Sequence, residues 1–422
     1  MTVEQARKTD RLTIRVIRTV QEIEDVRDIW VRWQKHPVTD IDFYLEQECT
    51  YPGFVRPHII VLYREGNPEA MLVGKLIHTR VQDFSIGLWS MWKPRARILR
   101  IPGAGLLGNP EPQHCEIFVR EIMAALERNE ADMATFRGFP VDSPTARVAA
   151  TLPTSLHRDP IHETELRNTM KLPGSIEEVL RGLSHDHRKM VRREARSLQA
   201  AHSNDLRVKC FTEVADIEQM IHDVEEVARK AWQRGRGGGF VDSASMRMRL
   251  HLAARKGWLR TYVLYLADRP SAFWMVTLYG GTCHLDYTGY DPGDSRYAPG
   301  TFLFIRMLED LCRQNVRGVD FGPGRNLYKR RFGNCNWQEA ATCVFAGTPR
   351  GIMLRVLRSV TGELDRLVRS CIGAIGLMPR VKKVWRQRLT QMWRLEPVGR
   401  GPGHVKRDTT LKRRDSDLGI RA

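Results

Sequence analysis

The pattern of apolar and polar positions divides most of the chain into two similar series of elements. The first series opens with an amphipathic helix at Ile23–Trp33, and two apolar runs around a Gly-Asn-Pro turn in HIIVLYREGNPEAMLVGKLIHT then predict a β-hairpin. A further strand-like run, RARILRIPG, leads through a loop rich in Gly and Pro to a helix at Cys115–Arg128 and a short strand in DMATFRGFP.

The second series begins with helices and continues with strands. Helices are predicted at Ser175–Leu183, in SHDHRKMVRREARSLQ, at Val214–Trp232 and at Ser243–Lys256. The runs LRTYVLYLA, AFWMVTLYG and TCHLDYTGY, separated by short turns, predict a three-stranded antiparallel meander. A loop, a helix, the short strand GVDFG, the segment NLYKRRF and the strand-like ATCVFAG follow.

Both series run from a helix through a hairpin, a strand, a loop and a second helix to a short strand that ends in Phe and turn residues. This order predicts an internal duplication, with one unit at residues 1–170 and another at residues 171–348. Beyond them, Arg355–Arg369 and Val381–Arg394 predict basic amphipathic helices in an extension, residues 349–395. Gly, Pro and charged residues dominate residues 396–422, which predicts a disordered basic tail.

Composition narrows the class of protein. The 422 residues are 42% hydrophobic and 27% charged, which is typical of a soluble globular protein. No apolar run approaches the roughly 18 residues that a membrane-spanning helix needs, and the first residues lack the apolar core of a secretory signal. Eight cysteines without a CxxC pair, and histidines without metal-ligand spacing, predict a cytoplasmic protein that needs no metal.

The positive charge is concentrated near the C-terminus. Residues 351–422 hold 17 Lys and Arg against 6 Asp and Glu, a net +11 of the total +18, which leaves +7 for the other 350 residues. Such an extension can attract acidic lipid headgroups or nucleic acid, or simply aid solubility. We expect no DNA binding by the body, and peripheral contact of the extension with the inner face of a membrane.

The stretch DPGDSRYAPGTFLFIRMLEDLC suggests an anion site. A Pro-Gly pair at a helix start keeps side chains away from the first backbone N–H groups, and the positive end of the helix dipole lies there. An ordinary junction between a loop and a helix is the alternative interpretation.

The order of elements and three motifs resemble the GNAT acyltransferases. SRYAPGT (Ser295–Thr301) takes the position of their pyrophosphate loop with altered spacing, and NLYKRRFG (Asn326–Gly333) resembles their Asn…Leu-Tyr region with a shortened Asn–Tyr interval. Ser184–Arg193, Tyr297–Gly300 and Asp320–Lys329 resemble motifs of the tandem branch, which includes Fem-type aminoacyl transferases and acyltransferases encoded with bacterial cellulose and exopolysaccharide genes. The resemblance covers roughly residues 11–348.

The resemblance implies an α/β (α+β) fold of two tandem GNAT-like units, each a mixed, mostly antiparallel sheet flanked by helices. The second unit is expected to bind acetyl-CoA or another acyl-CoA, and the first, degenerate unit to shape the acceptor site. The pyrophosphate would meet the loop residues Arg296, Tyr297, Pro299, Gly300 and Thr301.

The implied chemistry needs an acid, a base and a stabiliser of negative charge. Tyr328 is the candidate acid for the departing thiolate, and Lys329 would stabilise an oxyanion or bind an anionic acceptor. Alternation along TCHLDYTGY places four side chains on one face, so either of the first two is the candidate base: His284, Asp286, Thr288 and Tyr290. Packing without catalysis is the alternative for each of them.

The acceptor is expected to be an amine on a small molecule or a glycan. Candidate substrate-binding residues are Arg188, Arg192, Trp232 and Asp320. The two arginines belong to one basic side of a helix, which is either a solvated face or a wall that attracts CoA phosphates, an acidic glycan or tRNA.

The sequence thus predicts an acyl-CoA-dependent N-acyltransferase, with acetyl transfer to an amine in polysaccharide or cell-envelope biosynthesis. One alternative is a Fem-like transferase that uses aminoacyl-tRNA. A tRNA partner is expected only under this hypothesis. The other is an inactive GNAT scaffold that docks on a membrane or a synthase.

Overall fold

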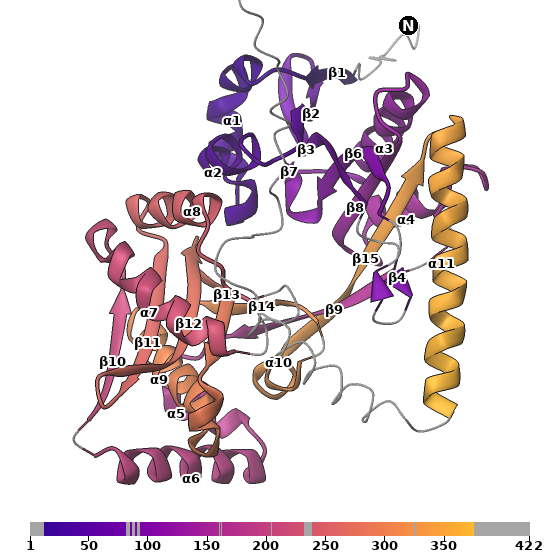
Figure 1. The fold of residues 1–422 in the computed structure, drawn as a ribbon. Coiled ribbons are helices and arrows are strands. Elements are labelled where there is room, and N and C mark those ends of the chain that lie inside the picture. Colours follow the sequence, from indigo (N-terminus) through magenta and orange to yellow (C-terminus); the bar gives the residue numbers. More distant parts are fainter. Residues whose placement is uncertain are drawn as a thin grey trace, which may run out of the picture.

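The computed structural model describes residues 12–81, 85–86, 89–90, 93–159, 161, 163–203, 205–231, 239–324 and 326–374 (Figure 1). Trp232, the predicted helix at Val381–Arg394 and the predicted disordered tail lie outside the described residues.

A 13-stranded mixed sheet runs through both halves of the chain in the order β1-β2-β3-β6-β8-β15-β9-β14-β13-β12-β11-β10, with β7 beside β3. The pairs β6–β8 and β13–β14 are parallel, and the other neighbours are antiparallel. The strands are β1 Leu12–Ile17, β2 Phe54–Arg64, β3 Asn67–Arg80, β6 Arg95–Pro102, β7 Leu106–Gly108, β8 Met133–Pro140, β9 Glu163–Lys171, β10 Leu206–Phe211, β11 Leu259–Leu266, β12 Arg269–Tyr279, β13 Thr282–Tyr290, β14 Gly318–Pro323 and β15 Cys335–Phe345; β4 Ser85–Ile86 and β5 Trp89–Ser90 form a separate hairpin.

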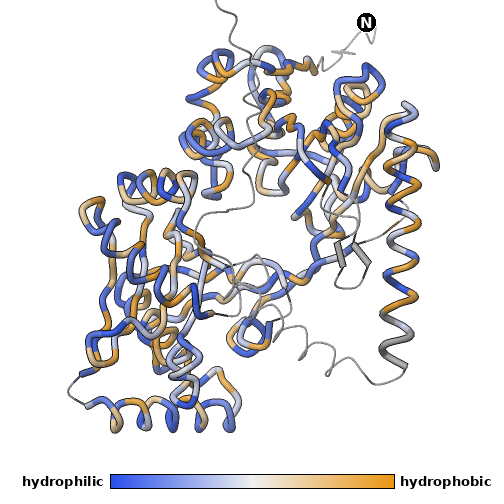
Figure 2. Tube along the Cα trace, in the orientation of Figure 1, coloured by the Kyte–Doolittle hydropathy of each residue, from blue (hydrophilic) through white to orange (hydrophobic). Residues whose placement is uncertain are grey.

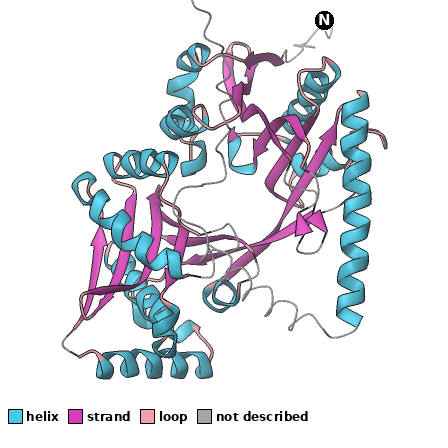
Figure 3. Cartoon of the chain, in the orientation of Figure 1, coloured by secondary structure: helices cyan, strands magenta, loops and turns pink. Residues whose placement is uncertain are grey.

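Helices cover both faces of the sheet in each half, and α11 stands at one side of the molecule next to β15 (Figure 3). They are α1 Arg27–Trp33, α2 Ile41–Phe43, α3 Pro112–Glu127, α4 Pro144–Thr151, α5 Ile176–Gly182, α6 His185–Ala201, α7 Ile217–Lys230, α8 Ala244–Arg255, α9 Pro299–Arg313, α10 Leu327–Phe332 and α11 Pro349–Ala374. Short turns of other helix types occur at η1 Gln21–Val26, η2 Pro37–Thr39, η3 Tyr44–Glu48, η4 Gly103–Gly105, η5 Val214–Asp216 and η7 Pro292–Tyr297. Among the described helices, none has the length and apolar character needed to cross a bilayer.

Both faces of the sheet carry apolar cores, which explains why many strands read as continuous apolar runs. In the second half, α5, α6 and α9 cover one core, which includes Phe304 and Val276. The helices α7 and α8 cover the other core, which includes Phe273 and Met275. The neighbours Met275 and Val276 on β12 thus point to opposite faces, as the period of two requires.

The mixed α/β architecture and the two main sheet signals of the sequence are confirmed. The predicted hairpin is β2–β3, and the predicted meander is β11–β12–β13. The predicted helix at Ile23–Trp33 is divided between η1 and α1.

The two halves share strands at their junction. The strand β9 ends at the predicted boundary, and it pairs with β14 on one side and β15 on the other. From late in the second series, β15 returns to pair with β8 of the first. Side chains from both series therefore meet where β15, β9, β14 and β13 lie next to each other. The unit boundaries themselves stay a prediction.

Candidate active site

The parallel strands β13 and β14 part at the centre of the molecule. Within the described strands their pairing is limited to Thr282–His284 against Gly318–Asp320. His284 and Asp320 are the last pair, directly opposite each other, so both lie where the gap between the strands begins.

A β-bulge at Asp286 changes which side chains share a face of β13. Leu285 pairs with Val276 and Tyr287 with Met275, so Asp286 is an extra residue opposite that step. Tyr287 consequently packs on the α7–α8 side, whereas Tyr290 packs in the α9 core. The predicted single face of four residues is therefore wrong: His284 and Asp286 border one cavity, while Thr288 and Tyr290 lie on the opposite face.

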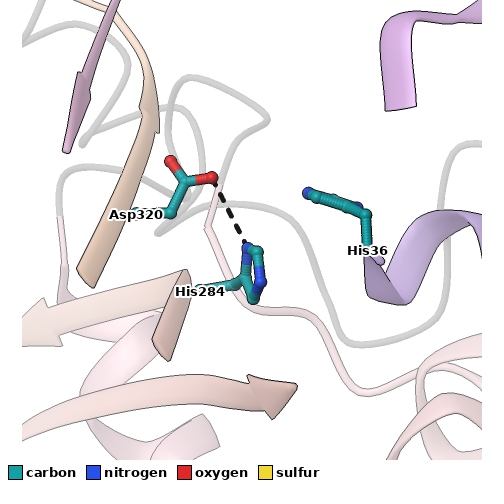
Figure 4. A group of neighbouring side chains, drawn as sticks. All are labelled: His36, His284 and Asp320. Carbon is teal, nitrogen blue, oxygen red and sulfur yellow. Dashed lines mark ion pairs between the residues drawn. The ribbon is translucent and has the colours of Figure 1, made fainter. Parts of the chain in front are cut away.

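His284 and Asp320 form a dyad on the two parting strands (Figure 4). Nδ1 of His284 lies 3.5 Å from Oδ2 of Asp320, and both residues are largely buried. The other ring nitrogen of His284, Nε2, is buried and has no hydrogen-bond partner among the described residues. A buried, unpartnered nitrogen at a cavity wall is expected to meet a ligand.

Arg167 and Glu339 extend this dyad across the sheet. The Arg167 guanidinium donates to Asp320 Oδ2, and its Nη1 lies 3.4 Å from Glu339 Oε2. Glu339, Arg167, Asp320 and His284 thus stand on the four adjacent strands β15, β9, β14 and β13. Burial alone would raise the pKa of Asp320, but the hydrogen bonds from His284 and Arg167 hold that pKa well below its usual range, so the carboxylate stays charged.

His36 reaches the dyad from the first half of the chain. Its ring lies edge-on to that of His284, with 4.6 Å between centroids. Burial above all, and then the nearby His284 and Arg167, lower the pKa of His36 to about 3, so its ring is neutral. Because Nδ1 of His36 accepts from the N–H of Val38 at 3.2 Å, the proton of the neutral ring is on Nε2. His36 therefore offers an uncharged N–H donor beside the base.

A cavity of about 150 Å³ joins these groups. Pro37, Val38 and Phe43 of the first half line it opposite α8, and Arg249 and Thr277 line it beside Asp286. The Arg249 guanidinium and the Thr277 hydroxyl, at 2.6 Å, both donate to the Asp286 carboxylate. Both oxygens of Asp286 thus already accept hydrogen bonds, whereas Nε2 of His284 has no partner among the described residues, so His284 is the stronger of the two candidates.

Three ligating groups, His36, His284 and Asp320, offer atoms within 4.8 Å of one another. Two histidines and one carboxylate are a familiar metal-ligand set. The same oxygen of Asp320, however, already accepts from Arg167 and faces His284, and a guanidinium at that distance repels a second cation. The arrangement favours proton transfer over metal binding.

The predicted cofactor residues surround the start of α9. Ala298, just before the helix, has φ +49°, a left-handed conformation that costs a non-glycine residue about 1–2 kcal/mol, and no described side chain caps the helix. Pro299 has no N–H, and the N–H of Thr301 donates to the Ala298 carbonyl, which leaves the N–H of Gly300 to meet an anion. The guanidinium of Arg296 lies over the Tyr297 ring, 4.5 Å from its centroid.

Tyr328 lies on α10 in an aromatic cluster and not in the wall of the cavity. Its ring centroid is 5.5 Å from that of Trp274, whose Nε1 donates to the Gly300 carbonyl at 3.0 Å. Trp274 thus connects the predicted acid with the predicted anion site. Burial raises the pKa of Tyr328 to about 12, so the phenol keeps its proton at neutral pH, as an acid for a thiolate must.

Lys329 is buried, and its Nζ donates to the Pro323 carbonyl at 2.6 Å, at the end of β14. Burial lowers its pKa. Lys329→Met should cost about 1–3 kcal/mol of stability, because the hydrogen bond from the buried amine to the Pro323 carbonyl is lost. Urea unfolding with Arg330→Met as the exposed control measures this cost. A Lys329→Met protein of normal stability with greatly reduced kcat would instead support the predicted oxyanion role.

The predicted substrate-binding residues are not brought together. Asp320 is in the dyad, but the Arg188 guanidinium donates to the carbonyls of Arg181 and Leu183 at the end of α5. Arg192 is exposed on α6, whose end packs against η7 through His202 and Tyr297. The basic side of α6 thus lies nearer the start of α9 than the cavity.

The corresponding helix of the first half, α3, begins differently. Its N-cap is Glu111, whose own N–H donates to Nδ1 of His114 at 3.1 Å in a capping box. A carboxylate at the helix start takes the place that an anionic ligand would need. The division of labour, in which only the second half binds an anion, stays a prediction.

Sequence reasoning missed His36, Arg167, Arg249 and Glu339. His36 stands in a loop, and β9 reads ETELRNTMK, which lacks a strand-like apolar pattern. His36, Arg167 and Glu339 belong to the site because segments from both halves meet at the junction, and Arg249 belongs to it because α8 packs beside β13.

Comparison with known proteins indicates the class of protein. Residues 185–330 match the family model described as an acetyltransferase (GNAT) domain. These residues are therefore identified as a GNAT acetyltransferase domain, which supports an acyltransferase. No curated protein matches the chain.

Several solved structures are distantly similar. FemX is 10% identical, with 75% of this chain and 95% of that chain covered and a TM-score of 0.48. A tandem GNAT protein from the clavulanic acid biosynthesis pathway is 13% identical, with 80% and 99% covered and a TM-score of 0.45. The C-terminal domain of a putative lysylphosphatidylglycerol synthetase from Agrobacterium fabrum is 12% identical, with 79% and 94% covered and a TM-score of 0.45. These values are too low to inform on substrate.

Proposed function

We propose that the protein transfers an acyl group, most simply acetyl, from acyl-CoA to an amine whose proton is taken by His284. The observation that carries the proposal is the dyad at the parting of β13 and β14, with Nε2 of His284 unpartnered among the described residues at the cavity wall.

The donor would lie along β13. Tyr290 is six positions beyond His284, about 20 Å of extended strand, and Tyr290 Cδ1 would be 3.6 Å from a Cβ added at Gly300. A pyrophosphate at the start of α9 therefore places the pantetheine arm beside the unpaired part of β13, with the thioester near the bulge. There the arm would pair with the strand as an added edge.

The reaction needs two proton transfers. His284 takes the proton of the attacking amine, and charged Asp320 stabilises the imidazolium and holds its Nδ1–H. The thiolate that leaves when the C–S bond breaks takes a proton from Tyr328, which is neutral at pH 7. The N–H of His36 is available to the acceptor or to the developing oxyanion.

The acceptor is proposed to be a neutral amine of modest size, free or linked to a glycan. Each charge at the cavity is matched, because Arg249 faces Asp286 and Arg167 faces Asp320. Apart from these charges and the polar side chains of His36, Thr277 and His284, the described wall is mainly apolar; its apolar residues include Pro37, Phe43 and Trp258. A role in polysaccharide or cell-envelope biosynthesis remains a proposal from the family resemblance.

Calorimetric titration with acetyl-CoA tests the donor. Gly300→Trp should abolish binding, since the added Cβ meets only Tyr290 and the indole would occupy the anion site. Gly174→Trp, where a Cβ meets nothing within 4 Å, is the control and should bind normally. If the folded protein does not bind acetyl-CoA, the hypothesis of an acyl-CoA-dependent transferase is wrong. Salt-sensitive binding of aminoacyl-tRNA would then favour the Fem-like alternative.

A further inference from the structure

The helix α11 has a second apolar face that no described residue covers. Its exposed apolar side chains are Ile352, Met353, Val356, Val360, Leu364 and Leu367, between 38% and 59% exposed. Spacings of three and four residues from Met353 to Leu367 place these side chains on one stripe, about 21 Å long. Figure 2 shows apolar colour recurring along this helix.

The opposite face fixes the helix on the protein. Leu354 is fully buried, and Arg358, 1% exposed, donates to Asp159 at 2.8 Å. Because this face is anchored, the stripe cannot turn inward and stays outward.

The charge of the chain identifies the kind of surface that fits. Residues 375–422, which continue from α11, hold 13 Lys and Arg against 4 Asp and Glu. The sequence at Val381–Arg394 predicts a basic amphipathic helix and includes two tryptophans, a pattern typical of segments that lie in a bilayer interface. A second copy of this chain would bring +18 against +18.

We propose that the outer stripe of α11 rests on an anionic membrane surface, to which the positive charge of the sequence that follows adds electrostatic attraction. Apolar burial and attraction to anionic lipid act together in such contacts. This inference is independent of the proposed acyl transfer, because α11 contributes no residue to the cavity.

Flotation of the full-length protein with phosphatidylglycerol vesicles tests the proposal, with phosphatidylcholine vesicles for comparison. The protein should float with the anionic vesicles. The triple variant Val356→Gln, Val360→Gln and Leu364→Gln keeps the charge and should weaken vesicle binding at least about tenfold. The control variant Val31→Gln, Leu156→Gln and Val214→Gln alters equally exposed side chains elsewhere and should bind normally.

Three results would overturn the proposal. The first is no binding to anionic vesicles, and the second is undiminished binding by the α11 triple variant, which would assign the contact to charge alone. The third is sedimentation of the unmodified protein as a dimer that the triple variant dissociates, which would assign the stripe to a second copy.

Discussion

Replacing His284 with alanine should lower kcat by about 10²- to 10⁴-fold, the usual contribution of a positioned general base. Acetyl-CoA affinity should change little, because the pyrophosphate, which is expected to supply most of the binding, lies about 20 Å along β13 from His284. The rate falls because no other described group that lines the cavity can act as the base in place of His284. Asp286 is held by Arg249 and Thr277, and the pKa of His36 is about 3.

The measurement is thiol release from acetyl-CoA in the presence of an amine acceptor, identified first with the unmodified protein. His78→Ala, an exposed histidine on β3, is the matched control. Added imidazole should restore part of the His284→Ala rate, since the removed ring leaves space beside Asp320. Normal kcat in His284→Ala would show that the dyad is not the base.

Asp320→Asn tests how the carboxylate of Asp320 helps His284 to act as a base. The amide keeps the shape of the carboxylate but not its charge, so it stabilises neither the imidazolium nor the required tautomer. We expect kcat to fall while KM for acetyl-CoA stays constant. The loss of the partner of Arg167 should also lower stability, which unfolding measurements made in parallel will reveal.

The local pattern of apolar and polar residues was enough to predict much of the fold. The hairpin β2–β3, the meander and the amphipathic helix α9 follow from alternation, turn residues and helical spacing, all of which act between near neighbours. The bulge at Asp286 could not be predicted in this way, because a bulge depends on the pairing with the partner strand and has no fixed sequence pattern. One extra residue was sufficient to move Thr288 and Tyr290 to the other face.

The site was predictable only in part, for the same reason. His284 and Asp320 were both singled out, but one as a base and the other as a substrate contact, whereas the strand register makes them a dyad. Arg167 and His36 are 153 and 248 residues from their partners Asp320 and His284, so no spacing rule connects them. Only the pairing of β9 with β14 and the approach of η2 bring them into place.

The largest expected effect on stability comes from breaking the buried ion pair that anchors α11. Asp159→Ala should lower the free energy of unfolding by about 3–5 kcal/mol, because it leaves the buried Arg358 guanidinium without its close partner. The remaining carboxylate, Glu163, is 3.4 Å away and half exposed. Asp159 also accepts from the N–H groups of Cys343 at 2.9 Å and Ile161 at 3.0 Å, so three segments lose a contact at once.

Urea unfolding monitored by tryptophan fluorescence measures this loss. Glu363→Ala removes an exposed ion pair with Arg366 on the same helix and should change stability by less than about 1 kcal/mol. Comparing the two variants shows how much of the loss in Asp159→Ala comes from the burial of its ion pair. An Asp159→Ala protein as stable as the unmodified chain would mean that α11 is not anchored through Arg358. The outward direction of its apolar stripe, which depends on that anchor, would then lose its basis.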